Sequence, residues 1–388
     1  MKIVLAPDSF KGNLTSMQVA TALEKGIRRV IPNAKCIKVP MADGGEGTVQ
    51  SLVDGSGGKF IRKKVVGPAG KPVMARYGLL ADGKTAVIEM AEASGLPYVK
   101  GKEKNPMKTT SFGTGELILD AIKKGAGKII LGIGGSATTD CGAGMAQAIG
   151  VKFLDKDGKE LKKYAAGGML DKVARIDVSN IDKSIAKTQI IVASDVENPL
   201  FGKKGAAYVF GPQKGATPAM VKTLDDNLKY FGNLIKKDLG KDISMLKGAG
   251  AAGGLGAGLV AFTGAKIKSG ISIVVDATRL KKHIKGADLV ITGEGRVDSQ
   301  TAFGKTPAGV AKAAKKYNVP TVAIGGGITD DAREVFTHGI DGLASACARD
   351  MNLDEAIKNS KEHLANAAER VIRLVLIGKK LSRQTKKK

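Results

Sequence analysis

Short apolar runs alternate with amphipathic segments along most of the chain, as in proteins whose strands and helices follow one another in turn. The continuous apolar runs predict buried strands, at residues 2–7, 36–40, 85–91, 128–133, 189–193, 271–275, 289–292 and 320–324. Segments with helical spacing of apolar positions predict helices, at residues 15–29, after Gly45, and at 113–124, 217–239, 306–317 and 352–377. Strands that alternate with helices are typical of an α/β fold with a largely parallel sheet.

Three of the predicted helices begin with a recognisable start signal. Thr15 and Gln18 have the spacing of a capping box, in which each side chain hydrogen-bonds the other residue's backbone. Thr217 precedes Pro218, which is well tolerated in the first turn of a helix because that turn leaves backbone N–H groups unpaired. Asn352 has the side chain of a helix cap at the start of the last helix.

The pattern changes at residues 60–80, where polar and apolar residues alternate around the turn-forming residues 67–70 (GPAG). This alternation predicts antiparallel strands. A second hairpin is expected at residues 152–161, with its turn at Asp157 and Gly158. We interpret the change near residue 60 as the start of a second domain inserted into the first.

The charge of the chain bears on its binding partners. The 62 Lys and Arg outnumber the 37 Asp and Glu, which gives a formal net charge of +25. Such an excess is compatible with nucleic-acid binding. However, the lysines are spread through nearly every segment, and aromatic residues, which stack on single-stranded bases, make up only 4%. The sequence therefore favours a solvated basic surface that attracts small anionic ligands over a nucleic-acid-binding protein.

The three cysteines, Cys36, Cys141 and Cys347, have neither the spacing of a zinc site nor that of a disulfide framework, and they fit a reducing, cytoplasmic compartment. The first residues reach polar positions too soon for a signal peptide, and no apolar run reaches the length of a membrane span. We expect the basic C-terminal segment 379–388 to be frayed. The sequence carries no signal for oligomeric state.

Glycine makes up 52 of the 388 residues, about twice the usual share, and it concentrates in five loops. Glycine lets a backbone approach a ligand closely and point its N–H groups at an anion. None of the loops is a P-loop or a dinucleotide-binding fingerprint. Taken together, the loops predict a site for a phosphorylated ligand, at residues 44–47, 132–135, 248–258, 293–295 and 325–327.

Polar residues stand beside these glycines at the predicted ends of strands, where ligands bind in doubly wound sheets. Carboxylates that hold Mg2+, one Asp that accepts a hydroxyl proton and a few cations are the groups that phosphoryl transfer needs. The glycines and their polar neighbours are the predicted substrate-binding and nucleotide-binding residues: Asp8, Ser9, Gly44, Gly45, Glu46, Gly134, Gly135, Ser136, Thr138, Asn198, Lys214, Gly253, Gly254 and Glu294. Histidine chemistry is not expected, because the three His residues lie far apart and outside the glycine loops.

Eight segments resemble, in order and over essentially the whole chain, the bacterial glycerate kinase family whose members form 2-phosphoglycerate. They are APDSFKGNLTSMQVA, PMADGGEGT, TSFGTGELI, LGIGGSATTDCGAGMAQAIG, ASDVENPLFG, FGPQKGA, GAGAAGGLGAGL and ITGEGRVDSQTAFGK. The resemblance implies phosphorylation of (R)-glycerate by ATP with Mg2+, in glyoxylate or related metabolism. It also implies a flavodoxin-like domain, at residues 1–65 and 286–388, interrupted by a second α/β domain with a mixed sheet at 66–285, and an active site in the cleft between the domains.

A different class of glycerate kinases carries loosely similar GGSA, SDV and GE…GR segments, and this analogy favours Ser136, Asp195 and Arg296 as active-site residues. We expect Asp195 to be the general base and Arg296 to stabilise the transferring phosphoryl group. Asp43 and Asp298 are the alternative bases and the candidate Mg2+ ligands.

Two lysines and two loops complete the expected site. Lys11 and Lys214 are candidates for binding the substrate carboxylate or the nucleotide phosphates. Residues 134–136 and 248–256 are the predicted phosphate cradles. At Cys141 the family usually has glycine, which indicates that the backbone at this position need not be left-handed and speaks against a direct backbone contact with phosphate there. The alternatives left open are a kinase for another small hydroxy acid and a basic nucleic-acid-binding protein.

Overall fold

The computed structural model describes residues 1–385, which divide into two units, each formed by separate stretches of the chain. Unit 1 comprises Met1–Asp43, Gln50–Ser56 and the described residues from Ile271 onward. Unit 2 comprises Gly44–Val49 and Gly57–Gly270. The expectation of one α/β domain interrupted by another is confirmed.

The boundaries lie elsewhere than expected, near residues 57 and 270 and not at 66 and 285. Strand β3 (Lys59–Val66) belongs to unit 2 because it pairs along its whole length with β4 (Pro72–Leu79). Helix α9 (Gly270–Ala277) belongs to unit 1 from its second residue onward, and the Ile271 side chain packs so closely on Gly309 that a Cβ on Gly309 would lie 2.1 Å from it.

Unit 1 is built on a five-stranded sheet in which every pairing is parallel. Its strands are β1 (Lys2–Leu5), β2 (Lys35–Lys38), β11 (Leu289–Val297), β12 (Thr321–Ile328) and β13 (Gly342–Ser345). Their spatial order, β13-β12-β11-β1-β2, is the 2-1-3-4-5 order of flavodoxin-like folds, which confirms the expected fold. The order reverses between β1 and β11, and in such sheets ligands bind beyond the carboxyl ends of the strands at this switch point.

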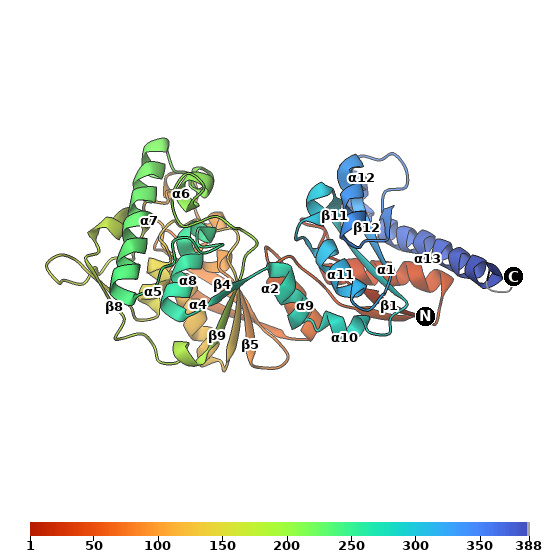
Figure 1. Cartoon of the computed structure of the whole chain (residues 1–388), viewed down its shortest axis with the longest axis horizontal. Helices are drawn as coiled ribbons and strands as arrows, with labels where there is room; N and C mark the ends of the chain where they lie inside the picture. Colours follow the sequence, from red (N-terminus) through yellow and green to blue (C-terminus); the bar gives the residue numbers. More distant parts are fainter. Residues whose placement is uncertain (386–388) are drawn as a thin grey trace. The chain divides into compact units, whose positions relative to one another are not determined.

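Alternating residues of the strands in unit 1 pack against helices on opposite faces of the sheet. Ile324 of β12 packs in the cluster that includes α1 and α13, whereas its neighbour Ala323 packs in the cluster that includes α11. Helices α1 and α13 lie side by side (Figure 1), and they approach so closely that a Cβ at Gly26 would lie 1.9 Å from the Ala365 carbonyl oxygen. The helices of this unit are α1 (Ser16–Val30), α9, α10 (Leu280–Ile284), α11 (Thr306–Lys315), α12 (Leu353–Lys358) and α13 (Ser360–Thr385).

Unit 2 is built on a six-stranded mixed sheet, as expected, with the order β10-β9-β6-β5-β4-β3. The first four strands pair in parallel, β4 pairs antiparallel with β5, and β3 pairs antiparallel with β4. The strands not yet located are β5 (Thr85–Glu89), β6 (Lys128–Gly132), β9 (Gln189–Ala193) and β10 (Lys266–Lys268). A separate pair, β7 (Lys152–Leu154) and β8 (Arg175–Asp177), makes a small antiparallel sheet.

The core of unit 2 forms where buried strand residues meet the apolar faces of helices. Ile88, Leu131 and Val192 come from three neighbouring strands and pack in one cluster with Leu117 of α4 and Phe231 of α7. The helices of this unit include α3 (Ala91–Ser94), α4 (Phe112–Lys123), α5 (Ala143–Ala148), α6 (Ala206–Phe210), α7 (Pro218–Leu239) and α8 (Leu255–Thr263). Helix α2 (Thr48–Ser56) starts in unit 2 and ends in unit 1.

Two predictions of local structure are wrong, at residues 271–275 and 352–377, and a third, at 152–161, is met in a shorter form. Residues 271–275 lie in helix α9 and do not form a strand, because a short apolar run is compatible with either structure. At 152–161 the chain turns back on itself through Asp157 and Gly158 as expected, with an antiparallel bridge between Leu154 and Glu160 and a hydrogen bond of 2.9 Å from the Leu161 N–H to the Phe153 carbonyl, although β7 makes its longer pairing with β8. The last predicted helix is two helices: Asn352 caps the short α12, and α13 follows separately.

Two further differences concern the ends of elements. β11 and β12 extend beyond their apolar runs to Val297 and Ile328, so the glycines at 293, 295 and 325–327 lie in strands and not in loops. Helix α13 continues to Thr385, so residues 379–385 are helical and not frayed, while 386–388 lie outside the described residues. Within residues 1–385, no helix combines the length and the apolar character needed to cross a bilayer.

Candidate functional site

Two carboxylates meet at the switch point of unit 1. Asp8 lies just beyond the end of β1, and its backbone N–H donates to the Gly293 carbonyl of the neighbouring strand β11 over 2.8 Å. Glu294 is the next residue along β11. The parallel pairing of β1 with β11 therefore brings both carboxylates to the carboxyl edge of the sheet, where flavodoxin-like folds bind ligands.

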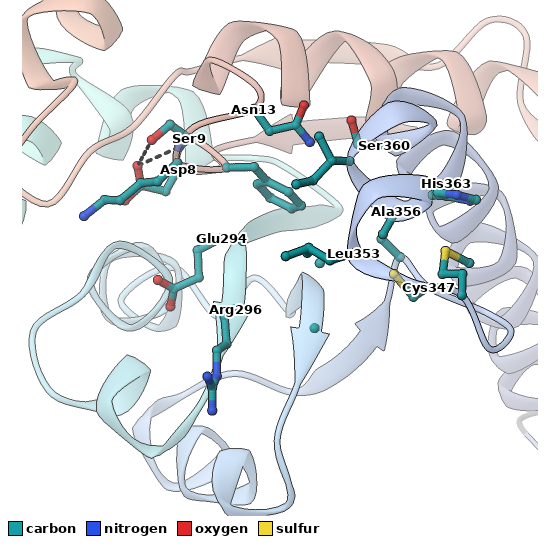
Figure 2. A pocket seen from close by; sticks show the side chains of 18 of the residues that line it. Asp8, Ser9, Asn13, Glu294, Arg296, Cys347, Leu353, Ala356, Ser360 and His363 are labelled. Carbon is teal, nitrogen blue, oxygen red and sulfur yellow. Dashed lines mark hydrogen bonds between the residues drawn. The ribbon is translucent and has the colours of Figure 1, made fainter.

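The two carboxylates line a pocket of about 920 Å3 that is formed by residues of unit 1. Figure 2 shows Asp8, Ser9, Glu294 and Arg296 on one side of this pocket and Leu353, Ala356, Ser360 and His363 on the other. The charged lining residues are Asp8, Lys11, Asp43, Glu294, Arg296, Asp298, Lys305, Arg349 and Asp350. Seven of the site residues predicted from the sequence are thus in one pocket: Asp8, Ser9, Lys11, Asp43, Glu294, Arg296 and Asp298.

Burial raises the pKa of Asp8 to about 6. The Thr306 hydroxyl and the Ser9 backbone N–H both donate to its carboxylate and lower the pKa in part, whereas the negative charge of Asp43 raises it further. Lys11 has a smaller lowering effect. Asp8 is therefore a buried acid that changes its charge close to neutral pH.

Burial also raises the pKa of Glu294, to about 7. The Thr301 hydroxyl donates to its carboxylate over 2.6 Å and Lys305 lies 3.9 Å away, and both lower the pKa. The charges of Asp8 and Asp298 act in the opposite direction. A carboxyl group that titrates near pH 7 in a pocket is suited to accept a proton during catalysis.

Asp298 and its two basic neighbours form the outer part of the same cluster. Asp298 caps the short 3-10 helix η7 (Ser299–Ala302) and lies 3.3 Å from the Lys305 ammonium group. Arg296 is 3.9 Å from Asp298, and its side chain is 72% exposed. Its guanidinium group is therefore available to an anionic ligand in the pocket.

The donor set of this pocket fits Mg2+ held jointly with a ligand. Within the described chain, no group of three His, Cys, Asp or Glu residues is arranged to hold a metal ion by itself. Mg2+, however, commonly takes one or two carboxylates together with substrate phosphates and waters. The charge of Asp43 raises the pKa of Asp8, and the charges of Asp8 and Asp298 raise the pKa of Glu294, so a bound cation would relieve this repulsion.

Unit 2 presents a second set of predicted residues at the carboxyl ends of its parallel strands. Gly134 and Gly135 follow β6 and are exposed, and Ser136 beside them is buried. Asp195 follows β9, is exposed, and accepts a hydrogen bond of 3.2 Å from the Gly270 backbone N–H. The Asn198 side chain instead donates to the Lys204 carbonyl and holds its own loop.

The first glycine loop has a structural explanation of its own. Gly44 has φ of +91°, and a Cβ there would lie 2.5 Å from the Cα of Gly270. The Gly45 carbonyl accepts a hydrogen bond of 2.7 Å from the Thr48 hydroxyl at the start of α2. Glu46 is exposed. Close packing and the start of a helix account for the two glycines, and only Glu46 of this group is openly accessible.

Lys214 and Thr138 are interior residues. The Lys214 side chain is fully buried and donates to the Thr138 carbonyl over 2.6 Å, and its burial lowers its pKa to about 7. The nearby Asp140 is also fully buried and accepts hydrogen bonds from the Ser111 N–H and hydroxyl. Lys214 therefore ties two segments of unit 2 together and is not exposed to a substrate, which differs from the expectation.

The loop at 248–256 is packed against protein. A Cβ at Gly253 would lie 2.0 Å from the Thr138 carbonyl oxygen, and one at Gly254 would lie 2.9 Å from the Cα of Cys141. Cys141 itself has φ of +53°, so the backbone is left-handed there although the residue carries a side chain, contrary to what its replacement of glycine indicated. Gly253 and Gly254 are buried, and close packing between loops accounts for them without a ligand.

Replacing Gly253 with alanine is expected to lower the free energy of unfolding by at least about 2 kcal/mol, because a side chain must enter the space of the Thr138 carbonyl at a left-handed residue. Urea unfolding measures the loss. Gly240→Ala is the matched control: φ is +68° there and the space around it is open, so only the backbone strain of about 1 kcal/mol applies. Equal losses in the two variants would contradict the packing argument.

Some residues of the site were not predicted from the sequence. Thr301, Lys305 and Thr306 hold or neutralise the carboxylates of Glu294, Asp298 and Asp8. In the sequence, the two threonines are marked only as residues at the start of a helix. Thr301 ends the pattern D-x-x-T that begins η7, and Thr306 precedes a proline at the start of α11. Such patterns identify a cap but do not show that the same hydroxyl reaches a carboxylate on a distant strand.

Known proteins of one family are similar to this chain over nearly its whole length. The model of the glycerate kinase family matches residues 3–376. The glycerate kinase of Halalkalibacterium halodurans is 54% identical over 95% of this chain and 97% of its own length. The glycerate 2-kinase of Escherichia coli K12 is 49% identical over 97% of this chain and 99% of its own.

One solved structure is similar to this chain both in sequence and in fold. The crystal structure of a protein provisionally assigned as glycerate kinase 2 from Salmonella typhimurium LT2 superposes with a TM-score of 0.90. It shares 48% sequence identity, over 98% of this chain and 99% of its own. The fold, the pocket at the switch point and the full-length matches agree, and the chain belongs to the glycerate kinase family.

Proposed function

We propose that this protein transfers the γ-phosphoryl group of ATP to the 2-hydroxyl of (R)-glycerate and releases 2-phosphoglycerate and ADP in the cytoplasm. Membership of the glycerate kinase family supports the reaction, and the name of the Escherichia coli relative supports the 2-position. The observation that carries the proposal is the buried Asp8 beside the partly buried Glu294, two carboxylates with raised pKa in a pocket at the switch point.

The reaction needs a group that takes the hydroxyl proton. The hydroxyl oxygen forms a bond to the γ-phosphorus, the bond to the bridging oxygen breaks, and the proton passes to a base. Glu294 is the favoured base, because its pKa of about 7 matches neutral pH. Asp195 remains the second candidate, on the sequence analogy and on its exposed position at the end of β9.

The cations of the pocket are proposed to neutralise charge. Arg296 would stabilise the transferring phosphoryl group through paired N–H groups, and Lys11 and Lys305 would bind phosphate or the glycerate carboxylate. Asp43 and Asp298 would hold Mg2+, which supplies positive charge to the ATP phosphates when it is bound.

Replacing Asp195 with asparagine tests the second candidate. Asparagine keeps an oxygen that can accept the Gly270 hydrogen bond, so the fold should survive. If Asp195 takes the proton, kcat should fall by at least about 100-fold in steady-state assays. Asp242→Asn, at an exposed aspartate, is the control and should keep normal kcat. A folded Asp195→Asn variant with near-normal kcat would remove Asp195 as the base.

The product itself tests the proposed function. Protein is incubated with ATP, Mg2+ and (R)-glycerate, and NMR identifies which carbon carries the phosphate. We expect 2-phosphoglycerate. Exclusive 3-phosphoglycerate would overturn the regiochemistry, and a much higher kcat/KM for another hydroxy acid would overturn the substrate. Salt-dependent DNA retention without glycerate-dependent ADP release would favour a nucleic-acid-binding protein instead.

A further inference from the structure

The pocket of unit 1 has two chemically different halves. Its charged half contains the carboxylates and cations described above. Its other half is walled mainly by apolar side chains from the loop after β1, the segment after β13 and helix α12: Phe10, Ala346, Met351, Leu353, Ala356 and Ile357. Figure 2 shows Leu353 and Ala356 facing the pocket across from Glu294.

Helix α12 exposes large apolar side chains on the face that lines the pocket. Leu353 is 74% exposed and Ile357 is 42% exposed, and the four-residue spacing puts them on one side of the helix. Asn352 caps this helix by accepting from the Glu355 N–H, which sets where the helix begins. A helix capped in this way presents its apolar face in a defined position, and apolar surface that lines a pocket marks a ligand contact.

The size of the pocket exceeds what a three-carbon acid requires. Its volume of about 920 Å3 is at the upper end of the range, about 300–1,000 Å3, that pockets for drug-sized ligands occupy. Glycerate is small and carries polar oxygens on every carbon, so it gains little from an apolar wall. A ligand with a charged end and a flat, apolar end matches both halves.

We propose that the apolar half of this pocket is the subsite for the nucleoside part of ATP. The base lies against Leu353, Ile357 and Phe10, and the phosphates extend to Lys11, Arg296 and Lys305 in the charged half. This inference rests on the proposed function, because the nucleotide is the phosphoryl donor of that reaction. It assigns α12 and the loop before it, which the sequence predictions did not include, to nucleotide binding.

Cys347 provides a direct test in the unmodified protein. It lines the pocket and is partly accessible, whereas Cys36 on β2 is partly accessible outside the residues that line it, and Cys141 is fully buried. Alkylation with N-ethylmaleimide is followed for each cysteine by peptide mass spectrometry. Saturating ADP should slow modification of Cys347 by at least about tenfold and leave Cys36 unchanged. An unchanged rate at Cys347 in protein that binds ADP overturns the subsite.

A matched pair of substitutions gives a second measurement. Leu353→Glu places a negative charge in the proposed subsite, and Leu374→Glu makes the same change at a leucine of α13 that is similarly exposed, at 69%, outside the pocket lining. Calorimetric titration with ADP should show an affinity at least about tenfold weaker for Leu353→Glu and unchanged for Leu374→Glu. Equal affinities for wild type and both variants overturn the subsite.

The proposed reaction and the proposed nucleoside subsite can be disproved independently of each other. Glycerate-dependent ADP release by the wild type is measured in the same preparation. An active wild type whose Cys347 is not protected by ADP overturns the subsite alone. Protection of Cys347 without phosphorylation of glycerate overturns the proposed substrate and leaves the nucleotide subsite in place.

Discussion

Replacing Arg296 with alanine is expected to lower kcat for glycerate phosphorylation by about 1,000-fold, within the range found for arginines that stabilise a transferring phosphoryl group. The side chain is largely exposed and contacts Asp298 only at 3.9 Å, so its loss should leave the fold intact. Arg296→Lys keeps the charge but not the paired N–H groups, so it should recover only part of the rate. Steady-state kinetics with saturating ATP and glycerate measures both variants.

The control for Arg296 is Arg175→Ala, which removes an exposed arginine on β8 in unit 2. Its kcat should equal that of the wild type. Full activity of Arg296→Lys would contradict the argument that bidentate contact matters, and near-normal kcat of a folded Arg296→Ala would remove Arg296 from the reaction.

Replacing Glu294 with glutamine is expected to lower kcat by at least about 100-fold, the lower end of what a general base contributes. Glutamine keeps an oxygen for the Thr301 hydroxyl but cannot take a proton. A base must be deprotonated to act, so wild-type kcat/KM should rise with pH through a pKa near 7, higher than a free glutamate would give. This rise of kcat/KM with pH on the acid side, the acid limb of the pH profile, should be absent for Glu294→Gln.

Glu197→Gln is the matched control, since Glu197 is an exposed surface glutamate paired with Lys247. It should keep both the rate and the acid limb. A folded Glu294→Gln variant that keeps near-normal kcat and the limb near pH 7 would move the proton acceptor to another carboxylate. Asp195→Asn then becomes the deciding measurement.

Local signals in the sequence predicted the elements whose formation depends on their own residues. Thr15 and Gln18 form the expected capping box, and Thr217 caps α7 as expected, because both patterns act within one turn of helix. The run at 271–275 was misread because its apolar residues carry no period that separates helix from strand. Burial of the apolar side chains Ile271, Ile273, Val274 and Val275 in unit 1, with Ser272 left exposed, decided the outcome.

Part of the candidate site could also be predicted from the sequence, because the positions of its residues relative to the strands are visible there. Asp43, Glu294, Arg296 and Asp298 stand close to glycines, Asp8 follows the end of β1, and the topology of a parallel sheet brings strand ends together. Lys214 and Gly253 stand in equally glycine-rich segments, yet they lie in the interior of unit 2. A glycine that permits a ligand and a glycine that permits another loop look the same in sequence, because both are required by a close approach.

The sequence alone determined the α/β class, the interruption of one domain by another and membership of the family, because periodicity and ordered motifs are properties of the chain itself. Only the tertiary structure decided which glycines face solvent, which lysine is buried, and which hydroxyls reach Asp8 and Glu294. It also showed α12 beside the charged cluster. These facts depend on contacts between residues far apart along the chain, as when Thr306 reaches Asp8, and no local pattern encodes them.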